Sequence, residues 1–173
     1  MKSQVRNESR ILGIDPSAKG FGFAVLEGRE ILVDWGTKEV SGNKNQSCLE
    51  EIEELLKLYR PHLIIVEDCQ SRGSRRSRRV KELISQIGRT AKEWGIQVRR
   101  VSRLAVKRVF AAWNAFNKHE IARVIAQQFV ELALRLPPRR RSWMSEDQRY
   151  SIFDAVALIL AYLERRSKHT QKP

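Results

Sequence analysis

Short apolar runs alternate with polar segments along this chain in a pattern that predicts a mixed α/β fold. Three apolar stretches near the N-terminus are separated by tight turns, which is typical of an antiparallel meander: 11–15, 22–27 and 31–35. An amphipathic segment, 47–60, then predicts a helix that ends before a proline, and the run HLIIVE at 62–67 predicts another buried strand. Because strand, helix and strand follow one another, we expect 11–15 and 62–67 to be parallel neighbours.

The second half of the chain is mostly helical by the same criterion. Apolar positions at helical spacing predict four helices, over 80–94, 103–113, 118–136 and 148–165, and an alternating segment predicts a strand at 96–101. The last helix is apolar almost all round, so it must pack on the sheet. We therefore expect a flexible N-terminal tail (1–10), a single domain (11–166) with a mixed central sheet flanked by helices, and a flexible C-terminal tail (167–173).

The charge balance indicates a polyanionic partner. The 33 lysines and arginines outweigh 20 acidic residues and give a net charge of +13, which favours nucleic acid, although basic ribosomal and membrane-surface proteins share this balance. The N-terminal segment lacks the apolar region of a signal peptide, and the longest apolar run, 152–163, is too short to span a bilayer. Cys48 and Cys69 have no paired spacing. We expect a soluble, cytoplasmic protein with reduced thiols and no membrane partner.

Three acidic residues occupy positions where a carboxylate is costly to bury. Asp15 and Glu67 end predicted strands, and Asp154 lies inside the apolar helix without a basic residue three or four positions away. If the strands are parallel and the helix crosses their ends, the three carboxylates converge and repel one another unless Mg²⁺ or Mn²⁺ lies among them. Two such ions would support hydrolysis of a phosphodiester. Taken alone, Asp15 also fits a simple turn before Pro16.

The stretches that carry these acids resemble the acidic motifs of the RuvC family of Holliday-junction resolvases, which have an RNase H-like fold. They are ILGIDPSAKGFGFAV, LIIVE and FDAVALILAYL, and the similarity runs from about residue 11 to 163. The resemblance implies that Asp15, Glu67 and Asp154 bind two Mg²⁺ ions, replaceable by Mn²⁺. It also implies a metal-dependent endonuclease that cuts branched DNA, above all four-way junctions, as a homodimer. Whether a branch-migration motor is a partner stays open.

A further block, AVKRVFAAWNAFNKHE, resembles the family segment that bears two functional basic residues. Lys107 and Lys118 fall on those positions with the separation kept. The resemblance implies that these lysines contact the junction or support phosphate chemistry. The residues alone also fit two ordinary exposed lysines.

The chain departs from the family pattern in two places. Ser151 stands where the family has a fourth metal ligand, one helical turn before Asp154. Asp147 is a candidate substitute, but it lies seven residues before Asp154, about 10 Å along an unbroken helix, and can bind only if its loop folds back. After Glu67, where the family often has an aromatic wedge, this chain has an arginine cluster.

That cluster contains six cationic residues within ten positions and no acid: Arg72, Arg75, Arg76, Arg78, Arg79 and Lys81. Its place next to the predicted site favours contacts with nucleic-acid phosphates over a merely solvated loop. Two other functions stay open. One is an RNase H-fold nuclease acting on RNA or RNA–DNA hybrids, similar to the YqgF branch. The other is a non-catalytic nucleic-acid-binding protein, which Ser151 favours.

Overall fold

The computed structural model describes residues 9–72 and 74–170. Its centre is a five-stranded sheet in the order β3-β2-β1-β4-β5. The strands are β1 (Arg10–Pro16), β2 (Gly20–Glu27), β3 (Ile31–Glu39), β4 (Leu63–Glu67) and β5 (Gln97–Val101). The first three strands pair in antiparallel fashion, whereas β4 runs parallel to both β1 and β5. This confirms the predicted mixed sheet with its N-terminal meander.

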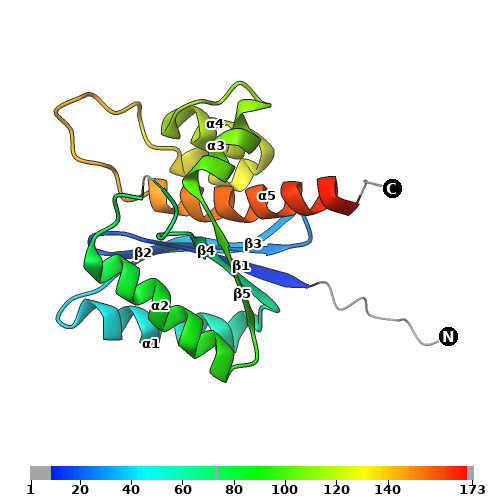
Figure 1. The fold of residues 1–173 in the computed structure, drawn as a ribbon. Coiled ribbons are helices and arrows are strands. Elements are labelled where there is room, and N and C mark those ends of the chain that lie inside the picture. The colour runs from blue at the N-terminus through cyan, green and yellow to red at the C-terminus, as the bar shows by residue number, and fades with distance from the viewer. Residues whose placement is uncertain (1–8, 73, 171–173) are drawn as a thin grey trace.

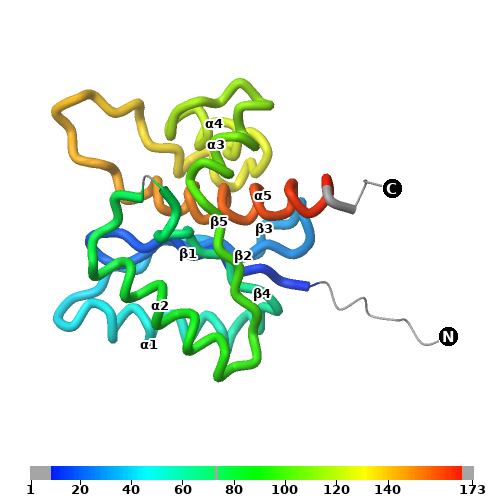
Figure 2. Tube along the Cα trace, in the orientation of Figure 1, coloured from blue at the N-terminus to red at the C-terminus, as the bar shows by residue number. Residues whose placement is uncertain are grey.

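Helices cover both faces of the sheet (Figure 1). One face is covered by α1 (Lys44–Tyr59) and α2 (Arg78–Glu93). On the other face α5 (Tyr150–Thr170) lies against the strands, and α3 (Arg103–Ala111) and α4 (Lys118–Gln128) lie beyond it. In Figure 2 the segment between α4 and α5 leaves this outer layer as a long loop and returns at the start of α5.

The alternation of side chains along the strands decides which acids face α5. Leu12 and Ile14 of β1 belong to the apolar cluster beneath α1 and α2, whereas Ile11 belongs to the cluster around α5. In β4, Ile64 and Val66 face α1 and α2 in the same way, and Leu63 and Ile65 face α5. Because successive side chains point to opposite faces, Asp15 and Glu67 both fall on the α5 face.

Two glycines let α5 lie close to the strands. A Cβ atom at Gly13 would lie 2.5 Å from the carbonyl oxygen of Ala155, and one at Gly22 would lie 2.3 Å from the carbonyl carbon of Ser151. Both distances are far below a van der Waals contact, so only glycine fits at these positions. The main chain of α5 therefore rests on β1 and β2, which places Asp154 above the end of β1.

Several element boundaries differ from the sequence-based expectation. The helix expected from residue 47 begins at Lys44, because the Asn43 side chain accepts a hydrogen bond from the backbone N–H of Gln46. The helix expected to continue to residue 136 ends at Gln128, and a 3-10 helix, Val130–Arg135, follows it. The predicted cap of that helix is confirmed, since Asn117 forms a reciprocal capping box with Glu120.

The last helix is longer than expected and runs to Thr170 rather than 165. Arg29, in the turn between β2 and β3, donates hydrogen bonds to Glu164 at 2.9 Å and to Ser167 at 2.6 Å, and so secures the final turns. The boundary expected between 166 and 167 falls within this helix. Residues 1–8 and 171–173 of the expected tails lie outside the described residues.

Both cysteines are free and buried. Burial raises the pKa of the Cys48 and Cys69 thiols, which keeps them protonated near neutral pH. Within residues 9–72 and 74–170, no helix combines the length and the apolar character that a membrane span requires.

Candidate active site

The carboxyl ends of β1 and β4 meet the second turn of α5 at one cavity. Ile14 pairs with Val66 in the parallel register, so the next residues, Asp15 and Glu67, end neighbouring strands at the same edge. Asp154 approaches from α5, and all three acids line the cavity. The structure thus brings together three carboxylates that are far apart in the sequence, as the strand and helix pattern predicts.

Two of these carboxylates, those of Asp15 and Asp154, lie in an environment that opposes their ionisation. Asp15 is 4% exposed and Glu67 is 2% exposed. Burial, with the nearby charge of Asp154, raises the pKa of Asp15 to about 7, against the opposing effect of Arg76 and Lys118. Burial also raises the pKa of Asp154, which the Lys118 ammonium opposes. Nearby cations, or a proton on one of the carboxyl groups, make such a cluster of acids stable near neutral pH.

Two arginines neutralise the acids at the strand ends. We call Arg76, Arg103, Asp15 and Glu67 together the arginine half of the site. Arg76 contacts Asp15 Oδ1 through Nη2, donates to Glu67 Oε2 at 2.5 Å through Nε, and donates to the Pro16 carbonyl at 2.9 Å through Nη1. The Nε atom of Arg103 donates to the other carboxylate oxygen of Glu67 at 2.8 Å. Both oxygens of Glu67 therefore have charged donors.

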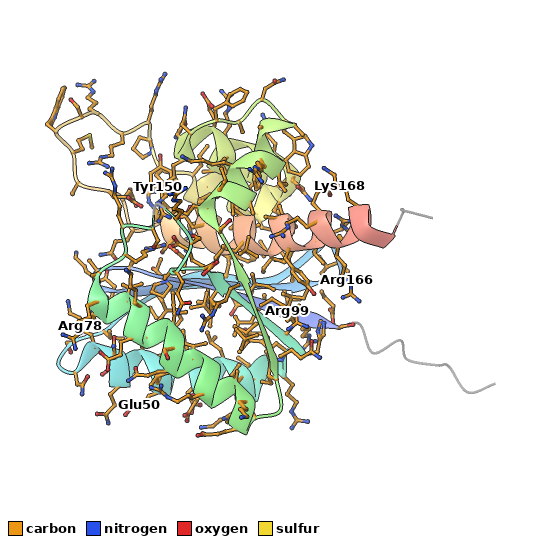
Figure 3. The ribbon with its side chains drawn as sticks, viewed as in Figure 1. Glu50, Arg78, Arg99, Tyr150, Arg166 and Lys168 are labelled. Atoms are coloured by element: carbon orange, nitrogen blue, oxygen red, sulfur yellow. The ribbon has the colours of Figure 1, made fainter. Side chains whose placement is uncertain are left out.

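Asp154, the acid on α5, pairs with a lysine instead. We call Lys118, Asp154 and Glu146 together the lysine half of the site. Lys118 is the first residue of α4, and its Nζ lies 2.7 Å from Oδ2 of Asp154. Apart from this ion pair, that buried oxygen has no hydrogen-bond partner among the residues that the structure describes. Lys118 also pairs with Glu146 and stands 5.5 Å above the ring of Tyr150, which Figure 3 labels at the start of α5.

Ser151, at the position of the family's fourth ligand, and Asp147, the predicted substitute, both lie away from this cluster. Ser151 is buried, and its hydroxyl donates to the carbonyl of Gln148 at 2.6 Å while its main chain packs on Gly22. The Asp147 carboxylate accepts hydrogen bonds from Arg149, at 2.6 Å from Nη2, and does not line the cavity. The residue of this loop that contacts the site is Glu146, which pairs with Lys118.

The predicted nucleic-acid-binding residues divide into exposed and engaged side chains. Arg72, Arg75, Arg78 and Lys81 are exposed, and Figure 3 labels Arg78 at the start of α2. Arg79 instead donates to the Asn45 side chain at 3.0 Å and to the Ser17 carbonyl at 2.5 Å, which ties α2 to α1 and the β1–β2 turn. Lys107 is exposed on α3 and lines the cavity.

Two residues of the site, Arg103 and Glu146, are absent from the sequence-based set. Arg103 follows the last residue of β5 by two positions, and β5 is a parallel neighbour of β4. The rule that parallel strands end at the same edge would have placed Arg103 beside Glu67. No comparable signal marks Glu146, which lies in the irregular segment before α5.

The donor chemistry of the site fits a hard divalent cation. Three carboxylates line one cavity, and Asp154 presents a buried oxygen whose only described partner is an ammonium group. As the side chains stand, however, no group of three or more His, Cys, Asp or Glu side chains in the described part of the chain is arranged to hold a metal ion. The positive charges in contact with these acids are those of the chain itself.

The fold is similar to solved structures of Holliday-junction resolvases. Thermus thermophilus RuvC in complex with a Holliday junction substrate aligns with a TM-score of 0.68 and 20% identity, covering 95% of this chain and 99% of that one. The chain has the RuvC fold. A second T. thermophilus RuvC structure gives a TM-score of 0.65 at 21% identity over the same shares of the two chains.

The yeast mitochondrial resolvase Ydc2 also shares the RuvC fold, with a TM-score of 0.62 and 16% identity over 94% of this chain and 81% of that one. Neither the profiles of known protein families nor the curated proteins gave a match. The resemblance inferred from the three acidic motifs is therefore confirmed at the level of the RuvC fold.

Proposed function

We propose that this chain is a metal-dependent, structure-selective endonuclease that resolves four-way DNA junctions. The observation that carries the proposal is the convergence of Asp15, Glu67 and Asp154 at one cavity of a RuvC fold. Two further observations support it: the net charge of +13 suits a polyanionic substrate, and one of the similar RuvC structures holds a Holliday junction.

In this proposal Asp15, Glu67 and Asp154 hold two Mg²⁺ ions, for which Mn²⁺ can substitute. Bound there, the metal would activate a water molecule and stabilise the leaving oxygen of a phosphodiester. Asp15 ends β1, which pairs with β4 and contacts α5, the two elements that carry Glu67 and Asp154. Its near-complete burial holds the carboxylate in one place against the end of β1.

The basic residues of the chain bind and orient the nucleic acid. Lys118, held at the N-terminus of α4 against Asp154, supplies a positive charge next to the reacting phosphate. Lys107 offers a second cation on the cavity wall. The exposed side chains of Arg72, Arg75 and Arg78 bind phosphates of the nucleic acid beside the site, which releases the counterions of those phosphates. Symmetric cuts in a junction require two such sites, so we propose that a homodimer acts.

The test is a cleavage panel with a four-way DNA junction, linear duplex DNA, an RNA–DNA hybrid and single-stranded RNA, each with Mg²⁺ and with EDTA. The wild type should cut the junction in Mg²⁺ only. Asp15→Asn should bind the junction but leave it uncut. Glu50→Gln, an exposed acid on α1 at the opposite face of the sheet, is the matched control and should cut like the wild type.

The same panel separates the alternatives. Preferred cleavage of the hybrid or of RNA would assign the chain to RNA metabolism. Binding without cleavage of any substrate would indicate a non-catalytic nucleic-acid-binding protein. The feature that favours this last outcome is the neutralisation of Glu67 by two arginines of the chain.

A further inference from the structure

One arginine of the basic segment before α2 is turned into the site. The Arg76 side chain is 16% exposed, whereas its neighbours Arg72 and Arg75 are exposed. Three of its nitrogens contact acceptors of the chain, on Asp15, Glu67 and the main chain of Pro16. Burying a guanidinium is unfavourable unless carboxylates neutralise it, so its position depends on those two acids.

We propose that Arg76 is a built-in counter-cation that competes with the divalent metal for Asp15 and Glu67, and that a nucleic-acid phosphate frees the carboxylates by taking the guanidinium. This inference rests on the proposed function, because it assumes that these acids bind metal. It adds an order of events: metal loading follows nucleic-acid binding. Cleavage chemistry is thereby confined to the bound substrate.

Competition follows from the atoms involved. Arg76 uses Oδ1 of Asp15 and Oε2 of Glu67, and Arg103 uses the remaining oxygen of Glu67. A cation shared by these two carboxylates competes with the arginines for both oxygens of Glu67 and with Arg76 for Oδ1 of Asp15. The guanidinium and the metal also carry charges of the same sign. Two such charges repel strongly when they contact the same carboxylates in a largely buried site. The two occupants therefore exclude each other.

The fold allows the guanidinium to leave without disturbing α2. Arg76 lies in an irregular segment, two residues before the helix begins. The start of α2 is held independently by Arg79, which donates to the Ser17 carbonyl, and by Ser77, whose hydroxyl caps the helix. A change of side-chain conformation at Arg76 is thus enough to open one oxygen of each carboxylate, Oδ1 of Asp15 and Oε2 of Glu67.

A phosphate backbone is a suitable acceptor for the released side chain. Arginine binds phosphate through two parallel hydrogen bonds, as it binds a carboxylate. The exposed neighbours Arg72, Arg75 and Arg78 mark the surface where the backbone of the proposed substrate runs. Because coupling between two ligands is reciprocal, bound metal must strengthen nucleic-acid binding by the same factor.

The experiment measures Mn²⁺ binding by calorimetry to the wild type, Arg76→Gln, Arg76→Lys and Arg75→Gln, all without nucleic acid. We expect Arg76→Gln to bind Mn²⁺ at least about tenfold more tightly, since the apparent Kd of the wild type is raised by the small fraction of molecules with free carboxylates. Arg75→Gln removes an exposed charge of the same segment and should stay within about twofold of the wild type because solvent screens it.

Arg76→Lys keeps one positive charge but loses the fork that reaches two carboxylates, so its Kd should lie between those of the wild type and Arg76→Gln. This variant also serves if Arg76→Gln does not fold. Equal Kd values for the wild type and both Arg76 variants would overturn the inference and leave the proposed function standing. No Mn²⁺ binding by any of the four proteins would overturn both.

A second arm tests the coupling with a fluorescent four-way DNA junction in EDTA or Ca²⁺, a hard cation that takes the same oxygen ligands. Ca²⁺ should strengthen junction binding by the wild type more than by Arg76→Gln. General salt screening acts on both proteins alike, so it cancels when the Ca²⁺-induced change in Kd of one protein is divided by that of the other. An equal effect of Ca²⁺ on both proteins would contradict the release of Arg76 by nucleic acid.

Discussion

The two halves of the acidic site neutralise their carboxylates by different means. In the arginine half, two guanidinium groups provide a fixed set of hydrogen bonds to acids that are almost fully buried. In the lysine half, a single ammonium lies between Glu146 and Asp154, and the Asp154 side chain is 24% exposed. Arginine presents planar, directional donors, whereas lysine acts as a mobile point charge.

The difference indicates a division of labour. Losing a cation should destabilise the fold most where Arg76 and the two carboxylates that it contacts are largely buried, at the ends of β1 and β4. The lysine half, which is wetter and joins α4 to α5, is better suited to follow a charge that changes during a reaction. Variants that remove one cation at a time test this division.

The largest effect should come from the arginine half. Arg76→Gln leaves two buried carboxylates without their shared partner, and breaking a buried ion pair in this way costs about 3–5 kcal/mol. Denaturant unfolding in EDTA at pH 7 measures the loss. The exposed control Arg75→Gln should change the free energy of unfolding by less than about 0.5 kcal/mol. Similar values for the two variants would remove the distinction between the halves.

A pH series sharpens the comparison at Asp15. Its pKa is raised to about 7 in the folded chain, so between about pH 4 and 7 the folded state holds a proton that the unfolded state has lost. The free energy of unfolding therefore falls as pH rises through this window, by at most about 1.4 kcal/mol per pH unit for one group. Asp154 adds a slope of the same sign, because its pKa is also raised.

Asp15→Asn removes the titrating group, so its free energy of unfolding should vary less with pH than that of the wild type. Denaturant unfolding at pH 5, 6 and 7 in EDTA compares the slopes. Parallel pH dependences of the two proteins would show that Asp15 does not hold the excess proton.

The smallest effect should come from the lysine half. Lys118→Ala leaves the buried Oδ2 atom of Asp154 without its charged partner, for which a loss of about 1–3 kcal/mol is typical, and we expect the lower end because the Asp154 side chain is 24% exposed. Lys107→Ala, on the wall of the same cavity, is the matched control for stability and should unfold like the wild type. A loss as large as that of Arg76→Gln would show that the two halves are equally important for folding.

The sequence was sufficient to predict the convergence of the carboxylates, and the resemblance pointed to Lys118, but neither singled out Arg76 and Arg103 as the partners of Asp15 and Glu67. Asp15 and Glu67 end apolar runs, and the rule for parallel strands converts that position into proximity. Arg103 obeys the same rule. In contrast, Arg76 is one of several arginines with similar neighbours, and local charge does not reveal which side chain turns inward. That choice depends on where the chain leaves β4 and enters α2, which is a property of the tertiary structure.

The direct seating of α5 on Gly13 and Gly22 has a consequence for how such a site tolerates variation. The height of Asp154 above the strand ends is fixed by main-chain atoms in contact with main-chain atoms. Gly13 and Gly22 therefore set the distance between α5 and the strands. A methyl group added at either position would push α5 outward and move Asp154 away from Asp15 and Glu67.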